Sequence, residues 1–489
     1  MDDAFTAPAI DWAALSPVLV TLAGATVVLL GSLFLPLRAR RAFGAAIASV
    51  CFVAAGAAAI ALFVGDETGR GIVSDALRRD RLAELAQVLI MGAGLLTVGV
   101  SYREPTRDDR AGEYWALLLT AASGMAFFVA ANNLMTLFLG LEWFSVCLYI
   151  LTAIAVERLP GLEAGLKYLI VGSFGSAILL FGSALVYGAT GAIGFEQIAA
   201  GTEGAEGLFV VTGLAMLLVG LGFKASAAPF HMWTPDVYEG APTTVTAFMA
   251  TATKAAAFAA FLRVFTGVMP DLQPDWRVAI ATIAVASIVV GNVAALVQTG
   301  MKRLLAYSSI AQAGYLLIGV AVGTIQGAEA VVYYLLAYGA MTMAAFAVVI
   351  IREREVEDGD SLAALTGYGR ARPLLGVVMA LSMLSLAGFP PLAGFVGKFL
   401  LFGSAVEADM TWLAIVGAVG SMVSLAYYLR VVAVMWMAPL EGQPRKLLRV
   451  PGPVALATVT SGVAVVALAL MASPVLDACR GAAEALLAP

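Results

Sequence analysis

Long apolar runs, separated by short stretches rich in charge, glycine or proline, set the pattern of this chain. The runs recur from Leu15 to Leu470 and are about 20 residues long, which is what a helix rising ~1.5 Å per residue needs to cross a ~30 Å hydrocarbon core. The pattern therefore predicts an all-α polytopic membrane protein with about fourteen transmembrane helices. The expected spans are residues 15–36, 43–64, 82–100, 114–131, 133–155, 162–189, 207–230, 242–268, 277–299, 303–323, 327–351, 373–402, 411–438 and 451–473.

These spans fall into groups within one membrane domain. The groups are N-terminal helices at 15–100, a first five-helix repeat at 113–268, a second at 277–438 and a C-terminal helix at 451–473, all within the single domain 1–489. Because five is odd, the second repeat enters the membrane in the opposite direction, so we expect two inverted repeats. Each repeat contains one helix broken by proline, near 224–230 and near 388–398.

An even number of spans places both termini on the same side. Basic residues gather in the loops after odd-numbered spans, among them Arg38, Arg40 and Lys302, so the positive-inside rule predicts that both termini lie outside. The N-terminal stretch "MDDAFTAPAIDW" lacks the basic region of a cleavable signal peptide, and we expect the first span to remain in the mature protein.

The composition narrows the function. The chain is 61% hydrophobic and 12% charged, which excludes a water-soluble domain, and its net charge of −5 indicates no nucleic-acid surface. Three scattered cysteines (Cys51, Cys147 and Cys479) and one histidine (His231) are too few for an iron-sulfur cluster, and there is no nucleotide-binding loop. We therefore expect no metal and no redox cofactor in this chain.

A few charged residues stand inside the apolar runs, where charge is costly and usually functional. Lys254 is about as far from both helix ends as possible, and Lys224 lies beside Pro229, which breaks the helix and favours a hydrated pocket. Glu142 is the acid expected deepest in a span, and its natural partner is a lysine on a neighbouring helix, for which we choose Lys224.

Other membrane charges have competing explanations. Lys398 follows two prolines by about two turns, and partial snorkelling competes with a functional role. Lys167 lies near a span end, where anchoring is at least as good an explanation as a relay role. His231 is either a structural donor or a group that passes protons beside the lysine. Arg263 and Arg430 lie near span ends and are expected to be interfacial anchors.

Lysine in this setting suits proton transfer. Burial lowers the pKa of an ammonium and a nearby carboxylate raises it again, so a buried lysine can exchange a proton, whereas arginine stays protonated. A row of Lys224, Lys254 and Lys398 on adjacent helices, fed by Glu142, is therefore expected to act as a proton relay.

Three motifs carry a family resemblance over roughly residues 113–438: "FKASAAPFHMWTPDVYEGAPTTVTAFMATATKAAAFAAF", "KRLLAYSSIAQAGY" and "SLAGFPPLAGFVGKF". They resemble the antiporter-like membrane subunits of proton-pumping NADH:quinone oxidoreductase, respiratory complex I. Within that family, "PDVYEGAP" after "PFHMW" and the lysine at 398 are similar to the subunit N group. The resemblance implies that Glu142 is the carboxylate of the fifth helix, Lys224 and Lys398 the lysines of the broken seventh and twelfth helices, and Lys254 the lysine of the eighth.

The resemblance also implies the setting. The partners would be other membrane subunits of complex I within a lipid bilayer, and NADH, FMN, iron-sulfur clusters and quinone would be bound by partner subunits. The location would be the bacterial inner membrane, with both termini on the periplasmic side. Two alternatives stay open: a subunit of a multisubunit cation/proton antiporter, and a passive spacer whose lysines merely pair.

Overall fold

The computed structural model describes residues 10–65, 69–102, 108–201, 207–437 and 447–487. Most of the acidic N-terminal stretch, and residue 438 at the expected end of the second repeat, lie outside these ranges.

The elements follow the order of the chain, beginning with α1 (Ser16–Phe34), α2 (Leu37–Val64), β1 (Arg70–Gly71), β2 (Arg78–Arg79), α3 (Arg81–Val100), η1 (Asp108–Arg110), α4 (Ala111–Val129), α5 (Leu134–Thr152), α6 (Leu159–Thr190), α7 (Phe195–Gly201), α8 (Gly207–Ala225), α9 (Thr234–Gly240), α10 (Thr243–Phe248), η2 (Met249–Thr253), α11 (Lys254–Phe261) and η3 (Leu262–Val268). The remaining elements are η4 (Pro270–Leu272), α12 (Gln273–Leu296), α13 (Met301–Val322), α14 (Ile325–Glu353), η5 (Ala363–Leu365), α15 (Tyr368–Ala371), α16 (Pro373–Ala387), α17 (Ala393–Glu407), α18 (Thr411–Trp436), α19 (Gly452–Leu470) and α20 (Ala472–Leu487).

The predicted membrane architecture is confirmed. Within the described ranges, thirteen helices are long and apolar enough to cross a membrane. The number rises to fourteen if the segments Ala363–Ala371 and Pro373–Ala387, which are bent by 118° at the break between them, count together as one span. The span expected at 373–402 forms two helices, α16 and α17, of 15 residues each. The all-α polytopic class therefore holds, and one predicted span is divided by its break.

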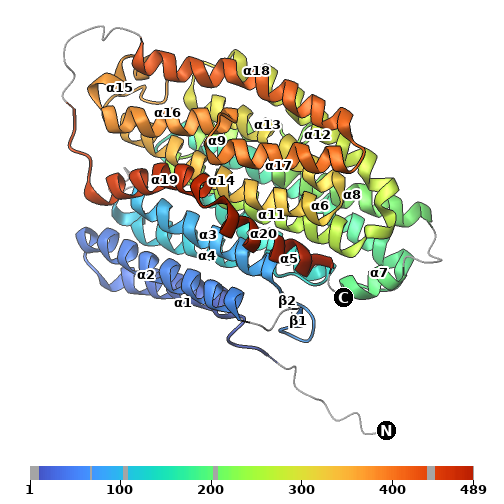
Figure 1. Cartoon of the computed structure of the whole chain (residues 1–489). Helices are drawn as coiled ribbons and strands as arrows, with labels where there is room; N and C mark the ends of the chain where they lie inside the picture. Colours follow the sequence, from blue (N-terminus) through green and yellow to red (C-terminus); the bar gives the residue numbers. More distant parts are fainter. Residues whose placement is uncertain (1–9, 66–68, 103–107, 202–206, 438–446, 488–489) are drawn as a thin grey trace.

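The helices run side by side, with α1 and α2 at one end of the molecule and α18 at the other (Figure 1). Burial separates centre from periphery, because all residues in an 18-residue stretch of Thr243–Val268 are buried, whereas 22% of the corresponding stretch of α2 is buried. Large apolar side chains such as Phe34 and Phe174 are exposed on the outer helices, as expected of surfaces that face lipid. The segment that contains Lys254 thus lies at the centre of the protein.

Side-chain caps mark where several spans begin. The Asp80 carboxylate accepts the Ala83 N–H at the start of α3, at 2.8 Å. Asn133 and Thr136 form a capping box at the start of α5. These caps satisfy N–H groups that a helix terminus leaves without intrahelical partners, so polar residues between the apolar runs fix the span ends.

Both described ends of the chain lie on the same face of the molecule. Ile10 pairs with Val73 in the β1–β2 hairpin, which leads directly into α3. Near the other end, Gly481 of α20 packs beside Arg81, the first residue of α3. The shared side agrees with an even number of spans, and the assignment of that side to the periplasm stays a prediction.

Candidate functional site

The first expected break lies where α8 ends, at Ala225. Ser226 then adopts a left-handed conformation with φ of 63°. Its N–H donates to the Phe223 carbonyl at 3.1 Å, and the Ala227 N–H donates to the Gly222 carbonyl at 2.8 Å. These two bonds form a Schellman motif, which closes a helix end. The chain resumes as α9, so the break expected in this span is confirmed.

The second break has the same construction. α16 ends at Ala387, and Gly388 adopts the left-handed conformation with φ of 88°. The Gly388 N–H donates to the Ser385 carbonyl and the Phe389 N–H donates to the Leu384 carbonyl, both at 2.9 Å. A second Schellman motif therefore separates α16 from α17.

The likeness between the breaks extends to the prolines. Three positions after the left-handed residue stands a proline, Pro229 in the first break and Pro391 in the second. The two Schellman motifs, each followed by a proline at the same spacing, support a relation between the two five-helix groups. Their inversion, and the domain limits that follow from it, stay predictions.

Lys224 lies in the last turn of α8 and is only 3% exposed. Its Nζ donates to the Ser145 hydroxyl at 2.7 Å and to the Tyr168 hydroxyl at 3.2 Å. The ring centroid of Phe144 lies 4.6 Å from the same nitrogen. The ammonium is therefore held by neutral oxygens and aromatic faces.

Glu142 and Lys224, which we expected to be partners, interact electrostatically and form no direct ion pair. Among the described residues, Lys224 forms no salt bridge, and the Oε1 atom of Glu142 has no hydrogen-bond partner. Glu142 is half-buried and is close enough to Lys224 to interact electrostatically. Ser145, three residues further along α5, supplies the direct contact in its place.

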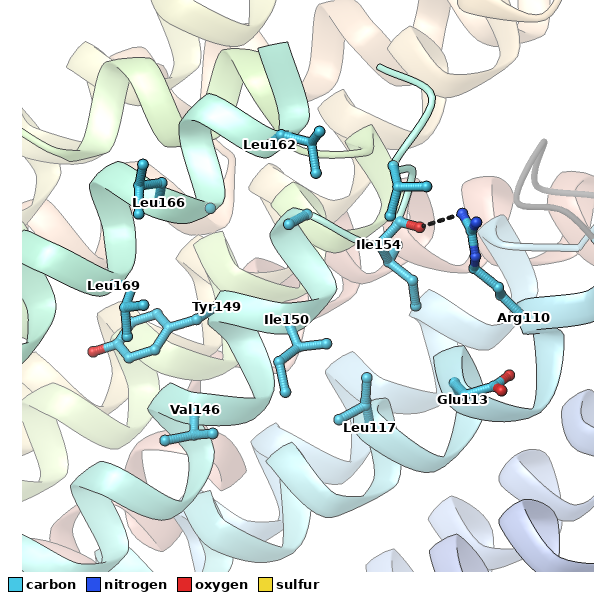
Figure 2. Close-up of a pocket in the computed structure, with 13 residues that line it drawn as sticks. Arg110, Glu113, Leu117, Val146, Tyr149, Ile150, Ile154, Leu162, Leu166 and Leu169 are labelled. Carbon is cyan, nitrogen blue, oxygen red and sulfur yellow. Dashed lines mark hydrogen bonds between the residues drawn. The ribbon is translucent and has the colours of Figure 1, made fainter. Parts of the chain in front are cut away.

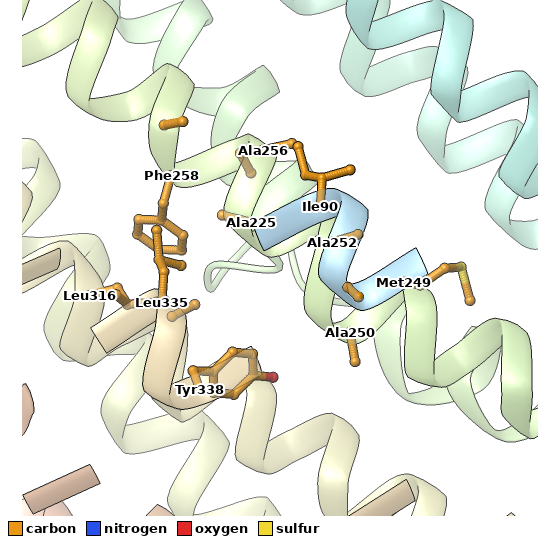
Figure 3. Close-up of a cluster of buried hydrophobic side chains, with 14 of the residues drawn as sticks. Ile90, Ala225, Met249, Ala250, Ala252, Ala256, Phe258, Leu316, Leu335 and Tyr338 are labelled. Atoms are coloured by element: carbon orange, nitrogen blue, oxygen red, sulfur yellow. The ribbon is translucent and has the colours of Figure 1, made fainter. Parts of the chain in front are cut away.

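Lys254 is the first residue of α11 and is 2% exposed. Turns of π-helix, η2 and η3, flank α11, and such turns are frequent at functional sites. The Lys254 Nζ donates to the Ser309 carbonyl oxygen at 2.6 Å, and the ring centroid of Tyr338 lies 5.4 Å away. The cluster in Figure 3 includes Ala252 and Ala256, on either side of Lys254 along the chain. The lysine therefore stands in a largely apolar centre with a backbone carbonyl as its acceptor.

Lys398, on α17, reaches back across the second break. Its Nζ donates to the carbonyl oxygens of Leu386 and Ala387 at 2.9 and 3.3 Å, and to the Ser421 hydroxyl at 2.8 Å. The Tyr315 ring centroid lies 4.5 Å from the same nitrogen. The last carbonyls of a helix lack intrahelical partners and carry partial negative charge, so the end of α16 is a suitable site for an ammonium.

A single turn of α13 joins Lys254 to Lys398. Ser309 accepts the hydrogen bond from Lys254, and Gln312 follows it by one turn. The Gln312 Nε2 donates to the Leu386 carbonyl at 3.1 Å, the same oxygen to which Lys398 donates. The structure therefore brings two of the predicted relay lysines onto one hydrogen-bonded segment.

Lys224 is linked to this segment by packing. α8 packs against α11, and Ala225, the neighbour of Lys224, belongs to the same apolar cluster as Ala252 and Ala256 (Figure 3). In the part of the chain that the structure describes, no side chain bonds both Lys224 and Lys254.

His231 lies in the loop of the first break, between α8 and α9. Its ring is half-buried, and its Nδ1 has no hydrogen-bond partner among the described residues. The position is as expected, and both interpretations of this histidine stay open.

Lys167 belongs to a group of ion pairs at the far end of the broken span. Its Nζ lies 2.8 Å from carboxylate oxygens of both Glu163 and Asp236. Arg303 pairs with the same Asp236 at 3.0 Å and with Glu239 at 2.7 Å. With 44% of its side chain exposed, Lys167 has the surroundings of an anchor rather than those of Lys224, Lys254 and Lys398.

Sequence reasoning missed Lys302, which it assigned to a loop. The residue is 1% exposed, and its Nζ donates to the Ala241 carbonyl at 3.0 Å. Glu353 lies 3.9 Å away and accepts a 2.8 Å hydrogen bond from Thr243. The available signal was the place of Lys302 in the motif "KRLLAYSSIAQAGY", immediately before an apolar run.

Arg263 is also placed differently from our expectation of an interfacial anchor. It is 5% exposed. The guanidinium donates two hydrogen bonds to the Asp80 carboxylate, of 2.6 and 2.9 Å, and one to the Val129 carbonyl, of 3.0 Å. Arg430 donates to the Leu296 carbonyl at the end of α12, as suits a residue near a span end. Arg263 is therefore a buried residue whose hydrogen bonds link η3 to the start of α3 and to the end of α4.

A groove of about 740 Å³ lies between α4, α5 and α6 (Figure 2). Its walls are mostly apolar, for example Leu117 and Ile150, and Arg110 stands at one end. Tyr149 lines the groove, and its ring centroid is 5.9 Å from the Lys224 Nζ. One aromatic side chain therefore lines the groove and also lies beside the Lys224 ammonium.

Comparison with known proteins agrees with this geometry. The sequence profile of the family described as NADH:quinone oxidoreductase/Mrp antiporter, TM, matches residues 131–424, a stretch that includes Glu142, Lys224, Lys254 and Lys398. NADH-quinone oxidoreductase subunit N of Salinibacter ruber is 47% identical over 354 residues, which are 72% of this chain and 70% of that protein. The protein of the same name from Chloroflexus aggregans is 40% identical over 449 residues, 90% of this chain and 91% of its own length.

Solved structures show the same fold. A chain of respiratory complex I from Thermus thermophilus, solved with bound aureothin, superposes with a TM-score of 0.79 at 37% identity and covers 94% of this chain and 98% of its own. A chain of the Mrp complex from Dietzia superposes with a TM-score of 0.84 over 97% of both chains, and its 23% identity shows the fold alone. The chain belongs to the family of antiporter-like membrane subunits of NADH:quinone oxidoreductase, in the subunit N group.

Proposed function

We propose that this proton-translocating subunit moves protons through a relay formed by Lys224, Lys254 and Lys398, with Glu142 as the acidic group at one end. Quinone reduction in partner subunits drives the relay. Protons pass between neighbouring groups when the charge of one of them changes.

One observation carries the proposal: the three ammonium groups are buried, and neutral acceptors hold each of them. Within the described residues, none of the three forms a salt bridge with a carboxylate. A charge that is not neutralised at low dielectric interacts strongly with any other charge that arrives nearby. This arrangement suits groups whose proton occupancy must respond to one another.

The acceptors also suit the chemistry. Hydroxyl and carbonyl oxygens hold the ammonium while it is charged, and the hydroxyls of Ser145 and Ser421 can also donate to a neutral amine. The sites of Lys224 and Lys398 can therefore satisfy both protonation states, whereas the acceptor of Lys254 is a backbone carbonyl. The Schellman motif at the second break leaves the Leu386 and Ala387 carbonyls available to Lys398.

The setting is the one that the resemblance implied. The partners are other membrane subunits of the complex, and the lipid bilayer surrounds the outer helices. In the described part of the chain no three His, Cys, Asp or Glu side chains group as a metal site. We assign NADH, FMN, iron-sulfur clusters and quinone to partner subunits, and both termini to the periplasmic side of the bacterial inner membrane.

The test uses the assembled complex in proteoliposomes, with protons translocated per NADH oxidised as the readout. Lys254→Met and Glu142→Gln should lower this quotient at equal amounts of assembled complex. Glu113→Gln, which changes an exposed acid at the start of α4, is the matched control. If both test variants translocate as many protons per NADH as the wild type, the relay assignment is wrong.

The runner-up is a subunit of a multisubunit cation/proton antiporter. The Mrp structure shares the fold, whereas the relatives from Salinibacter ruber and Chloroflexus aggregans, at 47% and 40% identity, are both named NADH-quinone oxidoreductase subunit N and favour the first function. Copurification with NADH-oxidising subunits supports the first function, and salt-gradient exchange without NADH supports the second.

A further inference from the structure

A buried amide stands in α12, outside the four groups of the proposed relay. Asn292 is 2% exposed in an otherwise apolar part of that helix. Its Nδ2 donates to the Tyr315 hydroxyl at 3.1 Å, and its Oδ1 accepts from the Tyr427 hydroxyl at 2.9 Å. Both ends of the amide are therefore used, on side chains from two other helices, α13 and α18.

The amide meets the ring that faces Lys398. The Tyr315 ring centroid lies 4.5 Å from the Lys398 Nζ, and the hydroxyl of that ring is the group bonded by Asn292. The ring also packs edge-on against Phe402 of α17, at 6.2 Å between centroids. Tyr315 is thus fixed at its hydroxyl end by Asn292 and along its edge by the helix that carries Lys398.

The packing around the amide leaves space for this contact. A Cβ atom on Gly420 of α18 would lie 3.2 Å from both the Asn292 Nδ2 and the Tyr315 hydroxyl, and 2.3 Å from the Ile288 side chain. The glycine lets α12 and α18 approach closely, so the hydrogen bonds form without a side chain between them.

We propose that Asn292 is a positioning residue for Lys398: it holds the face of the Tyr315 ring against the ammonium, and Tyr427 orients the amide from the other side. An aromatic face stabilises a desolvated cation electrostatically, and the effect depends on where the ring lies. Loss of the Asn292 contact frees the ring to rotate, and Lys398 then loses one of its four contacts. This inference rests on the proposed relay.

The experiment measures protons translocated per NADH in the assembled complex for Asn292→Leu, Tyr315→Phe and the double variant. Each single variant should lower the quotient by at least about half of the loss seen with Lys398→Met. The double variant should be no worse than the worse single one, because both changes remove the same bond. Tyr315→Leu, which removes the ring, should give the largest loss of the four.

Two controls keep the outcomes distinct. Tyr333→Phe removes a hydroxyl that bonds the Leu468 carbonyl elsewhere in the protein, and it should leave the quotient unchanged. Tyr427→Phe tests the amide if Asn292→Leu assembles poorly, and it should reproduce part of that variant's effect. If Lys398→Met lowers the quotient while Asn292→Leu or Tyr427→Phe does not, or if the single losses add in the double variant, the positioning role is refuted. A wild-type quotient for Lys398→Met refutes the relay itself.

Discussion

The ammonium of Lys224 lies 2.7 Å from the hydroxyl of Ser145, a residue on α5 that follows Glu142 by three positions. Helix α5, which carries Glu142, therefore contacts Lys224 through the neutral hydroxyl of Ser145. The Glu142 carboxylate interacts with the ammonium electrostatically, without a direct contact. In the proposed relay, this separation would let Lys224 and Glu142 change charge one after the other, because no direct ion pair holds them together.

Ser145→Ala should lower proton translocation per NADH. The change removes a hydrogen bond to a charged group, worth about 1.5–3 kcal/mol, and leaves the ammonium with Tyr168 as its only described hydroxyl partner. The control is Ser183→Ala, which changes a buried serine whose hydroxyl donates to the Leu179 carbonyl of its own helix, and both quotients are measured in proteoliposomes. Equal quotients in the two variants would show that the Ser145 contact has no role in transfer.

Lys167→Met should leave the quotient unchanged and slightly lower the temperature at which the complex comes apart. The side chain is substantially exposed and pairs with Glu163 and Asp236, so its loss weakens a surface ion-pair group. Thermal disassembly is followed at low and high salt, because salt screens such pairs and should reduce the difference from wild type. A quotient as low as that of Lys254→Met would instead place Lys167 in the relay.

Arg263→Met should reduce assembly strongly. It leaves the Asp80 carboxylate buried without its two guanidinium bonds, and breaking a buried pair costs about 3–5 kcal/mol. The amount of assembled complex is compared with that of Arg480→Met, which breaks a pair whose arginine side chain is 60% exposed. Similar yields of assembled complex from both variants would mean that the buried Arg263–Asp80 pair adds little to stability.

Gly388→Ala and Ser226→Gly should have opposite effects on stability. The left-handed conformation costs a residue with a Cβ about 1–2 kcal/mol, and a Cβ on residue 388 would also lie 3.0 Å from the Lys398 Cδ. Ser226→Gly relieves the same cost at the other break and should raise stability. Thermal disassembly of the solubilised complex checks both, and a change of the same sign in the two variants would contradict the shared geometry of the breaks.

The sequence predicted the span architecture and both breaks because their causes are local. An apolar run of membrane length and a proline inside it are visible without knowledge of the partner helices. The partners of the charges were harder to predict, because Lys224 and Ser145 are 79 positions apart in the chain and Arg263 and Asp80 are 183 apart. Lys302 was wrongly assigned to a loop for the same reason. Its position near the end of an apolar run does not reveal that Glu353 of α14 and Ala241, just before α10, contact its side chain and bury it.

The most direct test of the relay replaces Lys254 with arginine. Lys254→Arg keeps a positive charge at the centre of the protein but cannot give up its proton, whereas Lys254→Met removes the charge altogether. Protons translocated per NADH are measured in proteoliposomes that contain equal amounts of assembled complex. The account predicts that both variants lose translocation to a similar extent, and a Lys254→Arg complex that pumps at the wild-type quotient would contradict it.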